Sequence, residues 1–398
     1  MLAPVTGHAA IREFEPTLDD GALEDLRERL ERWRGPASGA EGWGRGVPGR
    51  WLERLVADWR AFDVAGLQAR LGRLDHALVD LDGQQIHFVR VSGRGDDPLP
   101  LILTHGWPGS FCEYLEVLEL LSDPVASGGE EMDSFTVIAP SLPGFAFSSP
   151  PPPEGLSASA IAELWNRLMT EVLGHDRYAA HGSDIGAGVT ARMARAHPEA
   201  VIGIHLATPG LPAPPRPWGD AEERHFAEVE AWAAEEGGYA HVQATKPLTL
   251  SAALADSPVG LAAWIGEKVS AWSSMTSDGE PAFDRELLLS TLTLSWATGT
   301  IASSILPYWT YRHDPSSALM ADDPPAVPTS VSIFGGERVP FPKPPRELAE
   351  RYFTIQSWNE HDRGGHFPAA ADPALFAQTL RDAFRPLRGS SASREETG

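Results

Sequence analysis

The spacing of apolar residues changes from helical to strand-like along the first part of the chain. Between residues 19 and 34 leucines recur three or four positions apart, which predicts an amphipathic helix, and residues 51–62 repeat this pattern. Two apolar runs follow at 77–81 and 85–91, and they flank Asp82-Gly83. Because Asp-Gly favours the tight turns that join antiparallel strands, this stretch predicts a β-hairpin.

Further along, short apolar runs alternate with helical patterns. The runs predict strands, and helices are predicted between them at 158–173 and 188–196. Strands that alternate with helices indicate a parallel sheet covered by helices. Residues 212–323 break the alternation with a mostly helical pattern, which predicts a lid inserted into an α/β domain. The predicted strands are 99–104, 135–139, 177–180, 201–206, 330–334 and 353–358.

Composition is that of an ordinary globular protein and excludes several partners. The 398 residues are 42% apolar, and 32 Lys and Arg against 55 Asp and Glu leave a net charge of −23. A chain this acidic repels phosphate, so neither nucleic acid nor an anionic membrane surface is expected as a partner. No signal-peptide pattern and no apolar stretch of about 18 residues occurs, which predicts a soluble, cytoplasmic protein.

Two residue types are scarce. Cys112 is the only cysteine, which excludes an internal disulfide and a cysteine-based zinc site. Lysine occurs only at Lys246, Lys268 and Lys343, and every other basic residue is arginine. Together with abundant alanine, glycine and proline, this bias indicates a GC-rich bacterial genome.

The segment 181–188 has the pattern of a nucleophile at a sharp turn between a strand and a helix. Small residues flank the central position of such a turn, because the bend leaves no room for larger side chains. Gly182 and Gly186 flank Asp184 symmetrically, so Asp184 is the predicted nucleophile, whereas a register centred on Ser183 lacks small neighbours. An aspartate that caps the following helix explains the same pattern, so this segment alone leaves both interpretations open.

Two glycine-rich loops supply candidate partners for Asp184. Residues 104–110 follow an apolar strand and can expose backbone N–H groups toward a developing oxyanion. His366 follows the last predicted strand, where it suits a general base. The triad order of nucleophile, acid and histidine places the acid after the preceding strand, where Glu337 lies. Asp362 is the competing acid, but it follows the wrong strand.

Together these motifs resemble the microsomal-type epoxide hydrolases, which are α/β-hydrolases with their own N-terminal region. The resemblance implies an α/β-hydrolase fold with a mostly parallel sheet, a helical lid inserted late in the sheet order, and the N-terminal extension. The expected divisions are an extension at 1–75, a core at 76–211 and 324–388, a lid at 212–323 and a disordered tail at 389–398. The similar segments cover nearly the whole chain and include 14–16, 51–62, 105–109, 139–148, 238–247, 256–264 and 365–367.

The resemblance implies a triad and a reaction. Asp184 matches the attacking aspartate, His366 the base that activates water, and Glu337 the acid that orients this base. The implied activity converts an epoxide to a vicinal diol through an alkyl-enzyme ester on Asp184, which water then hydrolyses. The expected reactants are a small-molecule epoxide and water, and neither a metal nor another cofactor is required.

Further implied roles belong to the lid and to two backbone groups. Tyr239 and Tyr308 match the lid tyrosines that hold the epoxide oxygen, with Tyr311 as an alternative to Tyr308. The backbone N–H groups of Trp107 and Ile185 match the oxyanion hole. The chain departs from the family pattern at Ile185, where tryptophan is usual, and just before the nucleophile, where serine replaces glycine.

Two other functions compete with this interpretation. A haloalkane dehalogenase also uses an aspartate, a histidine and an acid. It further needs hydrogen-bond donors that bind the halide, typically an indole N–H beside the nucleophile, and at that position this chain has Ile185. An inactive hydrolase fold that serves as a binding protein would be expected to have a broken triad. The sequence leaves open the epoxide itself (xenobiotic, terpene or biosynthetic intermediate), the regio- and enantioselectivity, and whether the protein forms a homodimer.

Overall fold

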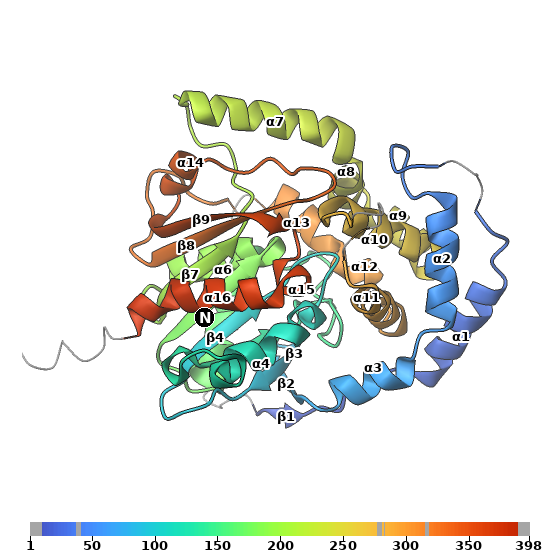
Figure 1. The fold of residues 1–398 in the computed structure, drawn as a ribbon, viewed down its shortest axis with the longest axis horizontal. Helices are drawn as coiled ribbons and strands as arrows, with labels where there is room; N and C mark the ends of the chain where they lie inside the picture. The colour runs from blue at the N-terminus through green and yellow to red at the C-terminus, as the bar shows by residue number, and fades with distance from the viewer. Residues whose placement is uncertain (1–9, 37–40, 277–280, 282, 315–317, 389–398) are drawn as a thin grey trace, which may run out of the picture.

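The structure is a computed structural model that describes residues 10–36, 41–276, 281, 283–314 and 318–388. Within these residues nine strands form one sheet in the order β1-β2-β3-β5-β4-β6-β7-β8-β9 (Figure 1). The predicted disordered tail at 389–398 lies outside the described residues. The strands are β1 (Arg12–Glu13), β2 (Asp75–Leu81), β3 (Gln84–Val91), β4 (Leu99–Thr104), β5 (Phe135–Pro140), β6 (Tyr178–Ser183), β7 (Val201–Ala207), β8 (Pro328–Gly335) and β9 (Thr354–Gly364).

The sheet is mostly parallel, as the sequence predicts. Every neighbouring pair from β5 to β9 runs parallel, whereas β1, β2 and β3 form an antiparallel edge that joins β5. The predicted hairpin is confirmed, with Leu81 opposite Gln84 across its turn. Central parallel strands are buried on both faces, which explains why Leu101, Ile102 and Leu103 of β4 form an unbroken apolar run without any exposure.

Helices cover both faces of this sheet. On one face α4 and α16 share an apolar cluster that includes Leu118 and Phe376. On the other face α5 and α6 pack together, with Trp165 and Val189 buried between them and the sheet. The predicted helix over 158–173 is α5 followed by a π-helical turn, η4. The covering segments are η1 (Phe111–Tyr114), α4 (Leu115–Ser122), η2 (Pro124–Ser127), η3 (Glu131–Asp133), α5 (Ala158–Arg167), η4 (Leu168–Val172), α6 (Ile185–Ala196), α14 (Arg346–Glu350), α15 (Pro368–Ala371), α16 (Pro373–Phe384) and η6 (Arg385–Leu387).

A helical lid is inserted between β7 and β8, as predicted. Figure 1 shows helices α8 to α13 gathered at one end of the sheet, with α7 running along its upper edge. In the described part of the chain no single helix is long and apolar enough to cross a membrane. Helices α9 and α10 reach that length and composition only when taken together, and they are bent by 118° where they meet. The lid helices are α7 (Asp220–Glu236), α8 (Gly238–Thr245), α9 (Pro247–Asp256), α10 (Pro258–Trp272), α11 (Arg285–Ala297), α12 (Ile301–Ser304) and α13 (Leu306–His313).

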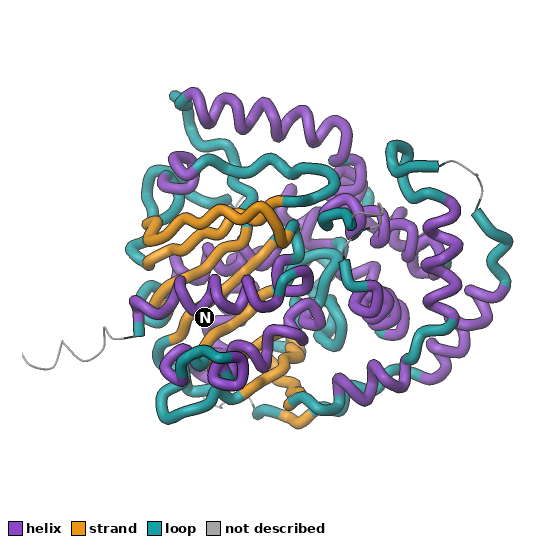
Figure 2. Tube along the Cα trace, in the orientation of Figure 1, coloured by secondary structure: helices purple, strands orange, loops and turns teal. Residues whose placement is uncertain are grey.

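The N-terminal helices pack on the outside of the lid. These are α1 (Asp20–Glu31), α2 (Gly49–Arg60) and α3 (Val64–Leu71), seen at the right of the strands in Figure 2. The Trp59 indole N–H donates to Thr293 Oγ1 of α11 at 2.9 Å in a buried site. Arg29 donates to the Asp256 carbonyl oxygen, where α9 ends, at 2.6 Å. The same N-terminal region also supplies β1, so it contacts both the lid and the sheet.

Candidate active site

Asp184 lies at the sharp turn between β6 and α6. Its backbone has φ 50° and ψ −123°, a conformation that non-glycine residues rarely adopt. It holds the N-cap position of α6, but its side chain makes no capping hydrogen bond, so the helix-cap interpretation does not explain this residue. The turn brings the backbone of α6 close to β4, since a Cβ at Gly186 would lie 2.0 Å from the Thr104 carbonyl oxygen.

Backbone N–H groups meet the Asp184 carboxylate at the end of β4. The N–H of Trp107 donates to Asp184 Oδ1 at 2.9 Å, and the N–H of Ile185 also interacts with this carboxylate. Gly106 permits this approach, because a Cβ there would lie 2.3 Å from Oδ1. The structure therefore places both predicted oxyanion donors at the predicted nucleophile.

His366 approaches the other carboxylate oxygen of Asp184. Its Nε2 lies 3.4 Å from Asp184 Oδ2, an ion-pair distance that does not meet hydrogen-bond geometry. The loop after β9 is fixed by the backbone N–H of His366, which donates to the Trp272 carbonyl at 3.0 Å, and by the Trp272 ring, 4.8 Å from the imidazole. Burial acts to raise the pKa of Asp184, but His366 and the two N–H groups outweigh it and bring this pKa below its usual value. Asp184 is therefore ionised at neutral pH, as a nucleophile must be.

Glu337 lies beside the histidine loop without a hydrogen bond to His366 among the described residues. Its Cγ is 3.7 Å from the position that a Cβ on Gly365 would occupy. Its side chain is only 4% exposed, and its Oε1 forms an ion pair with the Lys343 ammonium. Burial lowers the pKa of Lys343, and the charge of Glu337 opposes that effect. Asp362, the competing acid, is exposed on β9.

Two lid tyrosines face the same place. The Tyr239 ring of α8 stacks on Trp107 with centroids 5.6 Å apart, and the Tyr308 ring of α13 meets both rings edge-on at 5.9 Å. Tyr311 is 60% exposed, so Tyr308 is the tyrosine that joins this cluster. Burial raises the pKa of both phenols, and the charge of Asp184 adds to the effect. Both hydroxyls therefore stay protonated and available as donors at neutral pH.

Sequence reasoning missed three contributors to this region. Trp272, at the end of α10, contacts both His366 and Tyr239. The Lys268 ammonium lies 4.8 Å over the Tyr239 ring, and the scarcity of lysine was a signal that could have drawn attention to it. Glu113 is a buried carboxyl whose Oε1 lies 3.5 Å from Ser183 Oγ, directly behind the nucleophile turn.

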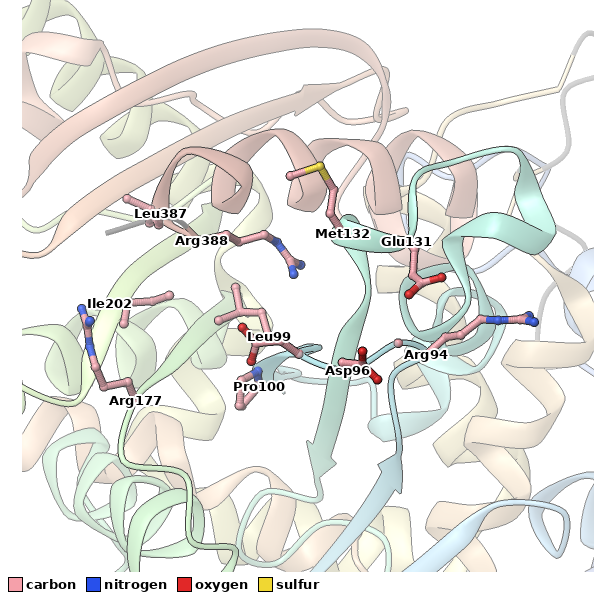
Figure 3. Close-up of a pocket in the computed structure, with 12 residues that line it drawn as sticks. Arg94, Asp96, Leu99, Pro100, Glu131, Met132, Arg177, Ile202, Leu387 and Arg388 are labelled. Atoms are coloured by element: carbon pink, nitrogen blue, oxygen red, sulfur yellow. The ribbon is translucent and has the colours of Figure 1, made fainter. Parts of the chain in front are cut away.

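A large surface cavity lies away from these groups. Figure 3 shows Arg388 and Asp96 among the residues that surround this space of about 450 Å³. Leu99 begins β4 and Arg177 directly precedes β6, so the cavity is at the amino ends of the strands, opposite Asp184. Its lining mixes arginines with acids and contains none of the predicted site residues.

Within the described ranges no group of three His, Cys, Asp or Glu side chains could hold a metal ion.

Known proteins resemble this chain in sequence. The family model described as the epoxide hydrolase N terminus matches residues 11–114, and the model described as the alpha/beta hydrolase fold matches residues 100–245. A Stigmatella aurantiaca protein named "Putative epoxide hydrolase" is 41% identical over 383 residues, which are 95% of this chain and 86% of that protein. Epoxide hydrolase 1 of Sus scrofa is 32% identical over 405 residues, with 94% of this chain and 88% of the pig protein covered.

Solved structures resemble it over the same length. The structure of the juvenile hormone epoxide hydrolase from the silkworm Bombyx mori has a TM-score of 0.80 at 29% identity, covering 96% of this chain and 94% of that one. The Aspergillus niger epoxide hydrolase has a TM-score of 0.81 at 26% identity, covering 96% of this chain and 98% of the fungal chain. The similarity thus includes the sheet, the lid and the N-terminal helices together.

Proposed function

Because the chain belongs to the epoxide hydrolase family, we propose that it opens its epoxide through a covalent ester on Asp184, which His366 and Glu337 then help water to hydrolyse. The observation that carries this proposal is the convergence on Asp184. One carboxylate oxygen accepts the Trp107 N–H at 2.9 Å, and the other lies 3.4 Å from His366. The two lid tyrosines both pack on Trp107, the residue whose N–H binds Asp184, and the charge of Asp184 acts on both phenols.

The first step forms the ester. An Asp184 carboxylate oxygen attacks an epoxide carbon, and the C–O bond of the ring breaks as the new C–O bond forms. The departing oxygen takes a hydrogen bond, and then a proton, from Tyr239 or Tyr308, since an unassisted alkoxide is a poor leaving group. Support comes from the two hydroxyls, which burial keeps protonated.

The second step breaks the ester. His366 takes a proton from a water molecule, and the resulting hydroxide attacks the carbonyl carbon of Asp184. The oxyanion that forms is stabilised by the N–H groups of Trp107 and Ile185, each worth about 3 kcal/mol in comparable holes. When this intermediate collapses, the bond between the Asp184 carbonyl carbon and the alcohol oxygen breaks, and the His366 imidazolium returns its proton to that oxygen. The remaining proton of the attacking water passes to the tyrosinate, so the diol leaves and the carboxylate, the imidazole and the phenol are all restored. Glu337, close to the histidine loop, supports the positive charge on His366.

A trapping experiment tests both steps. His366→Gln leaves the attack intact but removes the base, so one equivalent of styrene oxide should add one substrate mass, located by peptide mapping to Asp184. The wild-type protein should turn over without accumulating an adduct, and His241→Gln, an exposed lid histidine, should behave like the wild type. An adduct on another residue would refute the assignment. Turnover of a primary haloalkane in place of the epoxide would favour the dehalogenase alternative.

We also propose a cytoplasmic enzyme that needs no metal or organic cofactor and binds neither nucleic acid nor membranes. The steps above use only side chains, backbone N–H groups and water. The net charge of −23 disfavours anionic polymers and anionic lipid surfaces. Light scattering after size-exclusion chromatography distinguishes a monomer from a homodimer.

A further inference from the structure

Lys268 is one of three lysines in a chain with 32 basic residues, and it is buried in the lid. Its side chain is 8% exposed, and its Nζ lies 2.7 Å from Glu267 Oε2 and 3.7 Å from Glu236 Oε2. The same ammonium is 4.8 Å from the centroid of the Tyr239 ring, a distance typical of cation–π contacts. It is therefore a desolvated cation held against a proposed proton donor.

The surroundings of Tyr239 make this contact consequential. Trp107 stacks on its ring at an interplanar angle of 14°, and Trp272 meets it edge-on at 5.3 Å, so the ring has little freedom. Burial raises the pKa of the phenol, and the charges of Asp184 and Glu267 add to that effect. Without the ammonium, which lies 2.7 Å from Glu267 Oε2, the charge of Glu267 would act on the phenol uncompensated.

We propose that Lys268 is a positioning residue for Tyr239: its ammonium holds the ring and offsets the nearby carboxylates, so that the phenol donates more strongly to the epoxide oxygen. This inference rests on the proposed function, because it concerns the donor in the first step. A compact ammonium suits this place, since it fits between a ring face and two carboxylates, where the planar guanidinium of arginine needs more room.

A double-mutant cycle tests the proposal in the His366→Gln background, where the appearance of adduct reports ester formation alone. Lys268→Met should slow adduct formation about 10-fold, the order expected for a desolvated cation–π contact. In combination with Tyr239→Phe, the same change should have about a 2-fold effect or less, because Lys268 acts through the hydroxyl that is missing. Equal slowing in both backgrounds would mean a general structural role and would overturn the proposal.

Two further variants keep the test decisive if Lys268→Met folds poorly. Glu267→Gln leaves the ammonium in place and removes one opposing charge, so adduct formation should match or exceed the rate of the parent; a slower rate refutes the proposal. Lys246→Met removes an exposed lysine at the end of the same helix as Tyr239 and serves as the matched control. If the His366→Gln parent forms no adduct at all, the proposed function fails first, and this result is distinct from a parent that reacts but is insensitive to Lys268.

Discussion

Glu113 should make the stability of the fold depend on pH in a direction opposite to that of most carboxylates. This residue lies in η1, is 9% exposed, and forms no ion pair among the described residues. A small space beside its carboxyl is lined by Ser183 and by apolar residues that include Phe367 and Phe376, so few polar groups surround it. Burial, with a contribution from the charge of Asp184, raises the pKa of Glu113 from 4.5 to about 8.

The sign and size follow from proton linkage. Because the folded pKa is the higher one, the folded chain keeps a proton that the unfolded chain has already lost between pH 4.5 and about 8. The contribution of Glu113 to the free energy of unfolding is fully present below pH 4.5 and is lost as the pH rises through that window. The loss is about 1.4 kcal/mol per pH unit, or roughly 4–5 kcal/mol across the whole window.

Glu113→Gln isolates this effect, because the amide has nearly the same shape and never ionises. We expect its free energy of unfolding, measured by urea denaturation from pH 5 to pH 8.5, to rise relative to that of the wild type as the pH increases. Glu119→Gln, at an exposed carboxylate on α4, is the matched control and should keep a constant offset. A constant offset for Glu113→Gln as well would refute the claim that this carboxyl is neutral in the folded protein.

Two further predictions concern the proposed chemistry, and a third concerns stability beside the candidate site. Freshly purified Asp184→Asn should lose at least 1,000-fold in steady-state turnover while its circular dichroism is unchanged, because an amide does not form the ester; near-normal turnover would exclude Asp184. The pair Tyr239→Phe and Tyr308→Phe should together slow ester formation roughly 30- to 1,000-fold in single-turnover assays, and either change alone should slow it less. Lys343→Met should lower the free energy of unfolding by about 2–4 kcal/mol in urea, since it leaves the nearly buried Glu337 without its cation; an unchanged midpoint would contradict this.

Local pattern was sufficient for most of the sheet but not for its polar parts. The prediction ended one strand at Ala180, whereas β6 continues to Ser183. His181 looked like a loop residue, but it is fully buried, and its Nδ1 lies 2.9 Å from Nδ1 of His205 on the adjacent strand. A buried polar side chain that finds a partner on a neighbouring strand has no signature in its own segment.

The candidate site was predictable where chemistry requires fixed spacing within a segment. The glycines around Asp184 and the order of triad members depend on local geometry or on chain order. The choice between Tyr308 and Tyr311 was not predictable in this way, because both tyrosines lie on α13. Only the packing of that helix on Trp107 distinguishes the two. The partners of Lys343 and Lys268 were hidden in a similar way. Lys343 pairs with Glu337 within the loop after β8, and Lys268 meets Tyr239 where α10 packs on α8, so each contact depends on the fold of the surrounding segment.

The N-terminal helices have a consequence for protein engineering. They touch the lid through Trp59 and Arg29, whose acceptors lie on α11 and at the end of α9, and the same region adds β1 to the sheet. A chimera that transplants the lid of a relative alone would set a foreign surface against α1 and α2, and a residue without a hydroxyl at 293 would leave the buried indole N–H of Trp59 unsatisfied. The segment to exchange between relatives is therefore discontinuous in sequence. It comprises the lid together with the N-terminal helices that pack against it.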